Sequence, residues 1–246
     1  MIFLIMIVRL EDPSLLSKTI EVISELVTEV RIKLNEFGMS ITAIDPANVA
    51  MIKFRLPKSA FSQFETEEEV LGVNLDSLKK ILRRCGSGTP LIFIKKENLL
   101  QIEVQDRIKR DFSLNLIEIE SQEKEMPNLE YSAKVEISSL DLISAIEDCA
   151  VVSDACSFGV NNGEFIVESR GLNSACSTFS KDEAKIEAEN CKSKYSLDYL
   201  QKFMKGAKIC EKTILNFAND HPLKIDLKTE HMELNFILAP RVETDD

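Results

Sequence analysis

The chain has 246 residues, 44% of them hydrophobic and 29% charged, which is ordinary for a globular protein of one large or two medium domains. Its net charge of −11 argues, as an average, against nucleic-acid binding, because phosphate contacts need clustered lysine and arginine. The six cysteines form no CxxC pair and only two histidines are present, so we expect no zinc site, no disulfide framework and no metal or other cofactor.

The amino-terminal run Ile2–Arg9 is predicted to form the first strand. Its apolar part is too short to span a bilayer, which takes about 20 residues, and it lacks the basic flank and cleavage site of a signal peptide. We therefore expect an intracellular protein with no membrane partner, whose translation starts at Met1 or at Met6.

The first half of the chain alternates two amphipathic helices with short strands. A helix start at Asp12-Pro13-Ser14 precedes apolar residues that recur at helical spacing from Leu15 to Val27. A second helix is predicted within Val73–Cys85, where an apolar stripe lies opposite a basic face. The predicted strands are Val30–Leu34, Met39–Ile44, Val49–Leu56, Leu91–Ile94, Leu99–Val104 and Phe112–Ile119.

The stretch Glu118–Tyr131 is acidic, lacks regular periodicity after Ile119 and contains Pro127, so it is predicted to be an extended connector. After it the same order of elements returns, beginning with a strand and a helix capped by Ser138. The predicted strands of this half are Ala133–Ile137, Phe158–Val160, Phe165–Ser169, Ser174–Ser180, Ile214–Phe217, Leu223–Leu227 and Met232–Leu238.

The two halves share one clear sequence echo. YSLDYLQKFM at Tyr195–Met204 matches VNLDSLKKIL at Val73–Leu82 with a constant offset, 197 − 75 = 122. We predict an α+β tandem duplication: a strand-rich domain at 1–117, a connector at 118–131 and a second such domain at 132–246, each with two helices on one face of its sheets. Exposed edge strands would be natural assembly surfaces, and a closed ring would remove them.

Four segments, in this order and spacing, resemble the proliferating cell nuclear antigen family of sliding clamps: FGMSITAIDPANVAMIKFRL, VNLDSLKKILRRCG, MPNLEY and ILAPRVE. The length and short tail look archaeal rather than eukaryotic. The resemblance implies a DNA-clamp fold, a trimeric ring and helices lining a channel around double-stranded DNA, without sequence preference. It implies a non-enzymatic processivity factor of replication and repair, located in the cytoplasm at the nucleoid if archaeal and in the nucleus if eukaryotic.

By the same resemblance, basic residues of the helices would face the DNA. The residues facing the channel would be Lys18, Lys80, Arg83 and Lys205, with Lys79, Arg84, Lys202 and Lys208 as supporting DNA-binding residues. Without the duplication they would be interpreted as ordinary solvated helix faces. The third helix departs from the family, because Ser144, Glu147 and Val151 stand where relatives tend to carry bases. Both a homotrimer and a heterotrimer with paralogous subunits therefore remain open.

The resemblance also implies that DNA polymerase, flap endonuclease, DNA ligase and the clamp loader bind through short peptide motifs, in a pocket beneath the connector. The matching residues are Ile44, Asn48, Val49, Met51, Met126, Leu129, Pro222, Leu238, Ala239 and Pro240. Each could instead belong to the core, Met51 and Leu238 above all. Asn48 stands where many relatives have histidine, and Tyr131 is expected to anchor the end of the connector.

Subunit contacts of the family would pair about Lys109–Ile117 of one chain with Ser174–Ser180 of the next. The residues concerned are Lys109, Arg110, Phe112, Leu114, Ala175, Ser177 and Phe179. Arg107, Lys109 and Arg110, together with Lys181 and Asp182, could set partner choice by charge.

Two alternatives stay open at this point. A checkpoint-type clamp used in damage signalling is disfavoured by the compact length and the intact LAPR ending. A hydrolase or metal enzyme is disfavoured because the sequence shows no nucleophile with a base, no nucleotide-binding glycine loop and no ligand cluster.

Overall fold

The computed structural model describes residues 6–120 and 125–241, which fall into two compact units. The first unit is built from described residues within Met1–Pro46, Ile52–Met126 and Glu230–Glu233, and the second from those within Ala47–Met51, Pro127–Thr229 and Leu234–Asp246. The first residue Met1, the predicted strand residues 2–5 and connector residues 121–124 lie outside the described residues. No helix of the described parts is both long and apolar enough to cross a membrane.

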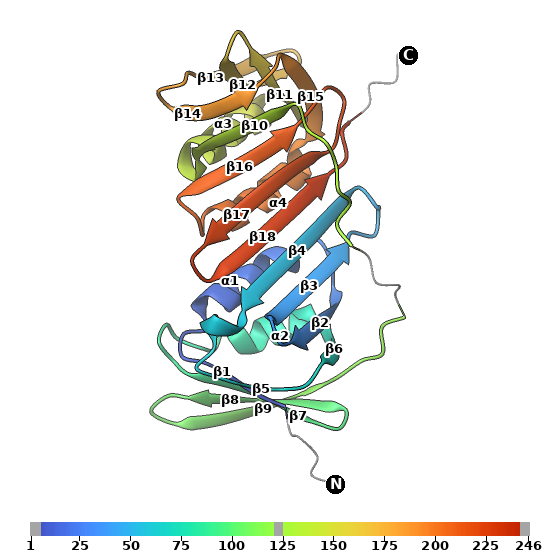
Figure 1. The fold of residues 1–246 in the computed structure, drawn as a ribbon, viewed down its shortest axis with the longest axis vertical. Coiled ribbons are helices and arrows are strands. Elements are labelled where there is room, and N and C mark those ends of the chain that lie inside the picture. The colour runs from blue at the N-terminus through green and yellow to red at the C-terminus, as the bar shows by residue number, and fades with distance from the viewer. Residues whose placement is uncertain (1–5, 121–124, 242–246) are drawn as a thin grey trace. The chain divides into compact units, whose positions relative to one another are not determined.

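The first unit contains two sheets and two α-helices among its described residues (Figure 1). One sheet has the strand order β5-β1-β7-β8-β9 and the other contains β4-β3-β2-β6. The elements are β1 Ile7–Leu10, α1 Ser14–Ile23, β2 Glu29–Asn35, β3 Gly38–Ile44, β4 Ala50–Pro57, the 3-10 turn Lys58–Ala60, β5 Gln63–Glu65, β6 Glu69–Asn74, α2 Leu75–Leu82, β7 Leu91–Lys96, β8 Leu99–Gln105 and β9 Lys109–Asn115.

The second unit repeats this arrangement within the part of it that is described. Its sheets contain β14-β10-β16-β17-β18 and β13-β12-β11-β15. The elements are β10 Ala133–Ser138, α3 Ser139–Val152, β11 Ala155–Asn161, β12 Glu164–Arg170, β13 Ser174–Phe179, β14 Ala184–Ala188, β15 Cys191–Ser196, α4 Leu197–Ala207, β16 Lys212–Phe217, β17 Leu223–Thr229 and β18 Met232–Leu238.

The tandem duplication is confirmed by this topology. Adding nine to each strand label of the first unit gives the strand order of the second, in both sheets. The helices that follow the sixth strand of each unit begin at Leu75 and Leu197, so the offset of 197 − 75 = 122 holds in the structure. The predicted α+β class with two helices per repeat is therefore correct.

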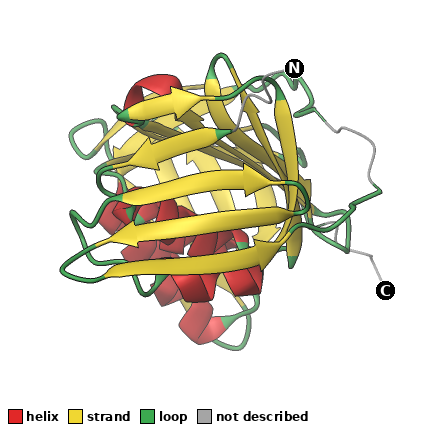
Figure 2. Cartoon of the chain, turned by 90° about the horizontal axis from the view of Figure 1, so that it is seen from below, coloured by secondary structure: helices red, strands yellow, loops and turns green. Residues whose placement is uncertain are grey.

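The core of each unit lies between its helix pair and its sheets. In the first unit Leu16 of α1 and Leu78 of α2 meet Ile32 and Phe93 from the two sheets around one small internal space. In the second unit α3 contacts β10 to β13, while α4 contacts β11 and β15. Figure 2 shows the helices in red behind the strands in yellow. The outer helix faces are thereby left for polar residues.

Several predicted boundaries are wrong for one physical reason, which is that strands run directly into helices. The segment Val73–Cys85, within which a helix is predicted, begins with the last two residues of β6, and its echo begins with Tyr195, a buried residue of β15. Asn74 ends β6 and also caps α2, its Oδ1 accepting a hydrogen bond of 3.0 Å from the Ser77 amide, so no turn residue marks the change. The short edge strands β5 and β14 were not predicted.

Two other elements end earlier than expected. α1 stops at Ile23, and Leu26 and Val27 are buried in the turn that follows. β9 runs from Lys109 to Asn115 rather than over Phe112–Ile119. The predicted cap of α3 is confirmed, since Ser138 Oγ accepts a hydrogen bond of 3.4 Å from the Asp141 amide.

Candidate nucleic-acid and partner surfaces

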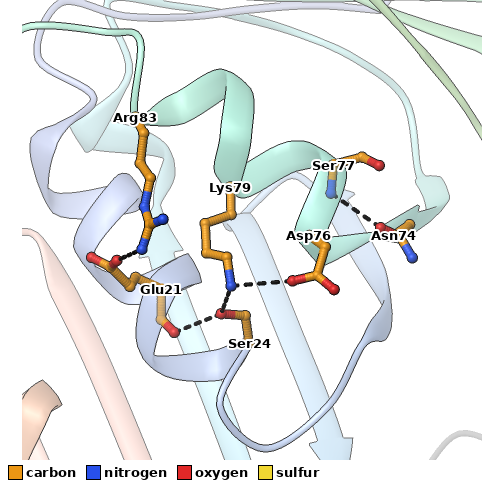
Figure 3. A network of polar contacts seen from close by, with 7 residues as sticks. All are labelled: Glu21, Ser24, Asn74, Asp76, Ser77, Lys79 and Arg83. Carbon is orange, nitrogen blue, oxygen red and sulfur yellow. Dashed lines mark hydrogen bonds and ion pairs between the residues drawn. The ribbon is translucent and has the colours of Figure 1, made fainter.

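The exposed sides of α1 and α2 carry a network of polar contacts (Figure 3). The guanidinium of Arg83, which follows the last residue of α2, forms an ion pair with the carboxylate of Glu21 on α1. Both side chains remain largely in solvent, with 58% and 45% of their areas exposed. Surface pairs of this kind contribute at most about 1 kcal/mol to stability and are screened by salt.

Lys79 takes part in the same network but is less exposed. Its Nζ donates a hydrogen bond of 3.0 Å to Ser24 Oγ and lies 3.1 Å from Asp76 Oδ1. Ser24 caps the C-terminus of α1, and its hydroxyl donates in turn to the Glu21 carbonyl oxygen at 2.8 Å. A positive charge at this helix end is favoured by the helix dipole. Lys79 thus connects the two helices, and its charge is compensated within the chain.

The other predicted DNA contacts differ in how strongly the chain engages them. Lys18, Lys80, Arg84 and Lys208 are exposed, and no ion pair involves them among the residues that the structure describes. Lys205 is exposed on α4. Lys202 is half-buried, pairs with Asp198 at 2.7 Å and lies 5.2 Å from the centre of the Tyr199 ring. The exposed set therefore lies on α1, α2 and α4 and in the turns that directly follow α2 and α4.

α3 offers no cation to a ligand, as its sequence indicated. Its buried residues Leu142, Ala145, Ile146 and Cys149 repeat the buried positions of α1 at an offset of 126, for example 142 − 16 = 126 for the leucines. By that offset Ser144 occupies the place of Lys18. Other exposed residues of α3 include Leu140, Glu147 and Val151.

Beneath the described part of the connector, the first unit contains an open cavity of about 590 Å³. Two of the predicted client-binding residues, Ile44 and Met126, line it. Its walls also carry charged side chains of β2 and β4 that the sequence reading did not assign to a site, namely Arg31, Lys33 and Lys53. The alternation of apolar and charged residues along β2 could have indicated Arg31 and Lys33, because they point to the face opposite the buried Ile32.

The second unit holds the remaining predicted client-binding residues. The Val49 carbonyl oxygen accepts a hydrogen bond of 2.8 Å from the Ala239 amide, which fixes Ala239 and the half-buried Pro240 beside this segment. Asn48 is exposed in a left-handed conformation with φ of 57°. Leu129 and Pro222 are half-buried. Met51 and Leu238 are buried, with 7% and 1% exposure, and are core residues in the chain described here.

Tyr131 ends the connector against His221, with ring centres 5.4 Å apart in an edge-to-face arrangement. Its hydroxyl is buried and finds no hydrogen-bond partner among the described residues. Burial, with a smaller contribution from the charge of Asp226, raises the pKa of Tyr131 to about 12. The neighbouring Tyr195 hydroxyl donates to the His221 carbonyl oxygen at 2.8 Å.

The two strands predicted to join subunits are both sheet edges. β9 is the last strand of the order β5-β1-β7-β8-β9, and β13 is the first of β13-β12-β11-β15. Phe112, Ala175, Ser177 and Phe179 are half-buried, and Phe179 stacks on Phe165 at 5.9 Å. Leu114 is already buried within the single chain.

The two predicted interface cations are engaged within their own chain. Lys109 Nζ lies 3.0 Å from Glu103, which raises the pKa of the lysine through that hydrogen bond and the nearby carboxylates. Arg110 donates to the Arg84 carbonyl oxygen at 3.0 Å and lies 3.6 Å from Asp106.

One backbone contact recurs in both units and was not predicted. The Ile117 amide donates to the Gly72 carbonyl oxygen at 3.0 Å, and the Arg241 amide donates to the Lys194 carbonyl oxygen at 2.7 Å. The acceptors are equivalent positions, because 194 − 72 = 122. The start of the connector and the described end of the chain therefore occupy corresponding places along β6 and β15.

The described residues contain no group of three or more histidine, cysteine, aspartate or glutamate side chains placed to hold a metal ion. The arrangement thus offers exposed cations on helices, an open cavity and free strand edges. These features favour binding of extended polyanions and of other proteins.

Comparison with known proteins covers both units. Residues 5–125 match the family description "Proliferating cell nuclear antigen, N-terminal domain" and residues 125–242 match the C-terminal domain of the same family. The "DNA polymerase sliding clamp" of Pyrococcus horikoshii is 36% identical over 235 residues, which cover 92% of this chain and 94% of the relative. "DNA polymerase sliding clamp 1" of Thermococcus kodakarensis is 37% identical over 228 residues, 89% of this chain and 92% of the relative.

A solved structure extends the comparison to the fold. The proliferating cell nuclear antigen of Entamoeba histolytica superimposes with a TM-score of 0.90 at 23% identity, covering 96% of this chain and 99% of that one.

Proposed function

The chain belongs to the proliferating cell nuclear antigen family, and from this premise we propose that it is a subunit of a DNA sliding clamp. In this role it encircles duplex DNA as part of a ring and tethers DNA polymerase as a processivity factor. The match of both halves to the two domains of this family carries the proposal, because a clamp needs the whole duplicated unit. Archaeal relatives at 36–37% identity named as polymerase sliding clamps support it.

The DNA contacts of this proposal are the exposed helix cations Lys18, Lys80, Arg84, Lys205 and Lys208, with Arg83 in a conditional role. Lys79 and Lys202 support the helices instead, because each is half-buried and bound to a carboxylate of its own helix. A few contacts suit a protein that slides, since affinity grows with each phosphate that a cation neutralises. Phosphate contacts carry no base information, so binding is independent of sequence.

Assembly into the ring pairs the β9 edge of one subunit with the β13 edge of the next, which would complete the hydrogen bonding of both strands. The exposed face of α3 lacks cations, so partner subunits with a more basic third helix would strengthen the lining. Light scattering of the chain alone separates the two assemblies: a stable trimer contradicts an obligate heterotrimer.

Client proteins dock on the cavity lined by Ile44 and Met126 and along the connector. Flap endonuclease, DNA ligase and the clamp loader are proposed as clients besides polymerase, each binding through a short peptide. The chain itself is proposed to have no enzymatic activity. It is proposed to act at the genomic DNA, which in an archaeon is the nucleoid in the cytoplasm. Nuclease or ATPase activity that a point mutation in the purified chain abolishes would contradict the first of these statements.

The decisive experiment measures DNA synthesis by a cognate polymerase on primed circular DNA with the ring loaded. The variant Lys80→Glu with Arg84→Glu should reduce stimulation at moderate salt, and Lys96→Glu, an exposed lysine on β7, is the matched control. Full stimulation by the double variant would contradict the proposed lining, and no stimulation by the wild-type ring would contradict the function.

A further inference from the structure

The ion pair between Arg83 and Glu21 sets a carboxylate in direct competition with any phosphate that Arg83 would bind (Figure 3). We propose that Glu21 is a positioning residue that limits the affinity of the clamp for DNA, because its carboxylate pairs with Arg83 whenever no phosphate is near. The inference rests on the proposed function and adds a regulation of its DNA-facing surface.

The exposure of the pair shows that it is not needed for packing. Glu21 and Arg83 lie 62 residues apart in sequence, on separate helices, and about half of each side chain is in solvent. An exposed pair is weak and exchanges readily for another anion, so DNA can take Arg83 from Glu21. The binding free energy of each Arg83–phosphate contact is then reduced, because the ion pair between Arg83 and Glu21 must break first.

Lys79 provides the internal contrast, since its side chain is only 21% exposed. It is held at once by Asp76 and by Ser24, so leaving for a phosphate would break two contacts and uncover the end of α1. Arg83 has one carboxylate partner and no such structural duty among the described contacts. The network therefore divides the cations of α2 into a fixed residue, Lys79, and a releasable one, Arg83.

The duplication repeats the same combination of residue types. By the helix offsets described above, Glu147 of α3 stands at the place of Glu21, since 147 − 21 = 126, and Lys205 of α4 stands at that of Arg83, since 205 − 83 = 122. An acid on the first helix and a base at the end of the second is thus a feature of both units. Its recurrence supports a role beyond a chance surface contact.

The test compares Glu21→Gln, Arg83→Gln and the double variant in the full-length, assembled clamp. Binding to a short fluorescent duplex is measured by anisotropy across a salt titration. Glu21→Gln should tighten binding, by up to about fivefold per subunit, because an exposed pair no longer competes. The logarithmic salt slope should steepen by about 0.9 for each Arg83 that reaches a phosphate. Arg83→Gln should weaken binding and flatten the slope.

The double variant separates the proposal from a general charge effect. If Glu21 acts through Arg83, adding Glu21→Gln to Arg83→Gln changes neither affinity nor slope. An equal gain in both backgrounds, or no gain from Glu21→Gln alone, overturns the proposal. If the Glu21 proposal is overturned but Lys80→Glu with Arg84→Glu still weakens binding in the same assay, the proposed clamp function is retained. If none of these variants changes binding, the function itself fails.

Discussion

The carbonyl oxygen of Gly72 accepts a hydrogen bond from the amide of Ile117, and at this point β6 and the start of the connector are in such close contact that no side chain fits between them. A Cβ atom on residue 72 would lie 1.9 Å from the Ile117 carbonyl oxygen. The obstacle is backbone rather than a flexible side chain, so a larger residue must displace the connector.

Gly72→Ala should therefore destabilise the protein by about 1–3 kcal/mol, the usual range for overpacking. Thermal and denaturant unfolding measure this. Gly159→Ala is the matched control, because its nearest contact would be an ordinary 3.4 Å from the Cys191 carbonyl oxygen. Equal melting temperatures for the two variants would show that the connector is not held at Gly72.

Lys79 and Lys80 are adjacent in sequence and should give opposite phenotypes. Lys79→Met should lower the free energy of unfolding by about 0.5–1.5 kcal/mol, because hydrogen bonds between α1 and α2 are lost, and should leave the salt slope of DNA binding unchanged. Lys80→Met should leave stability within about 0.5 kcal/mol and flatten that slope. A flattened slope for Lys79→Met alone would reverse the assignment.

The caps of α2 and α4 allow a comparison within the duplication. Asn74 Oδ1 accepts from the Ser77 amide, whereas the equivalent Ser196 makes no capping hydrogen bond through its side chain. Asn74→Ala should cost about 1 kcal/mol of unfolding free energy, and Ser196→Ala clearly less. Urea denaturation of both variants measures the difference, and equal losses would mean that the cap is not the cause.

Glu168 predicts an acid-sensitive step in stability. Hydrogen bonds from Lys192 and from Arg170 lower the pKa of this carboxyl in the folded state. Its stabilising contribution is therefore complete above the pKa of an unfolded glutamate, about 4.3, and is lost as the pH falls through the lower folded pKa. Glu168→Gln should flatten the decline of unfolding free energy below pH about 4.5, as should Lys192→Met, and an unchanged pH profile would contradict this.

The cavity beneath the connector predicts a selective loss of client binding. Ile44→Glu should reduce the affinity for a client peptide by tenfold or more while the ring stays assembled, because a peptide side chain that packs on the apolar Ile44 would bury the new charge. Pro240→Glu, which lies outside the cavity beside the Val49–Ala239 contact, should also weaken peptide binding. Phe37→Glu is the matched control, as Phe37 is 60% exposed and does not line the cavity. Calorimetry measures the affinities, and an unchanged value for Ile44→Glu would remove this assignment.

The sequence predicted the repeat and the basic helix faces because both depend on local patterns. Leu75 and Leu197 mark the echo directly, and the helical spacing of Lys80 and Arg84 indicates exposure. The missed elements depend on tertiary contacts instead. β6 passes into α2 at Asn74 without a turn signal, and Ile117 has strand-like composition but leaves β9 and donates to the Gly72 carbonyl oxygen of β6.

The side chains that pair with the cations could not be predicted from the sequence either, because these pairs are also tertiary contacts. Nothing local relates Arg83 to Glu21 or Lys79 to Ser24, which come together only when α1 and α2 pack. The close contact at Gly72 could have been predicted from the sequence, because an isolated glycine in a strand often marks a close approach of another backbone segment.

The matching contacts of Ile117 with Gly72 and of Arg241 with Lys194 bear on how such a chain can be engineered. In each unit one amide beyond the last strand donates to a carbonyl oxygen of the sixth strand, so the backbone at Arg241 holds the place in its unit that the start of the connector holds in the first. In a fusion of two such chains, the backbone at Arg241 of the first copy would already be held against β15 and could lead into the linker. Single-chain fusions joined just beyond Arg241 should need little added spacer.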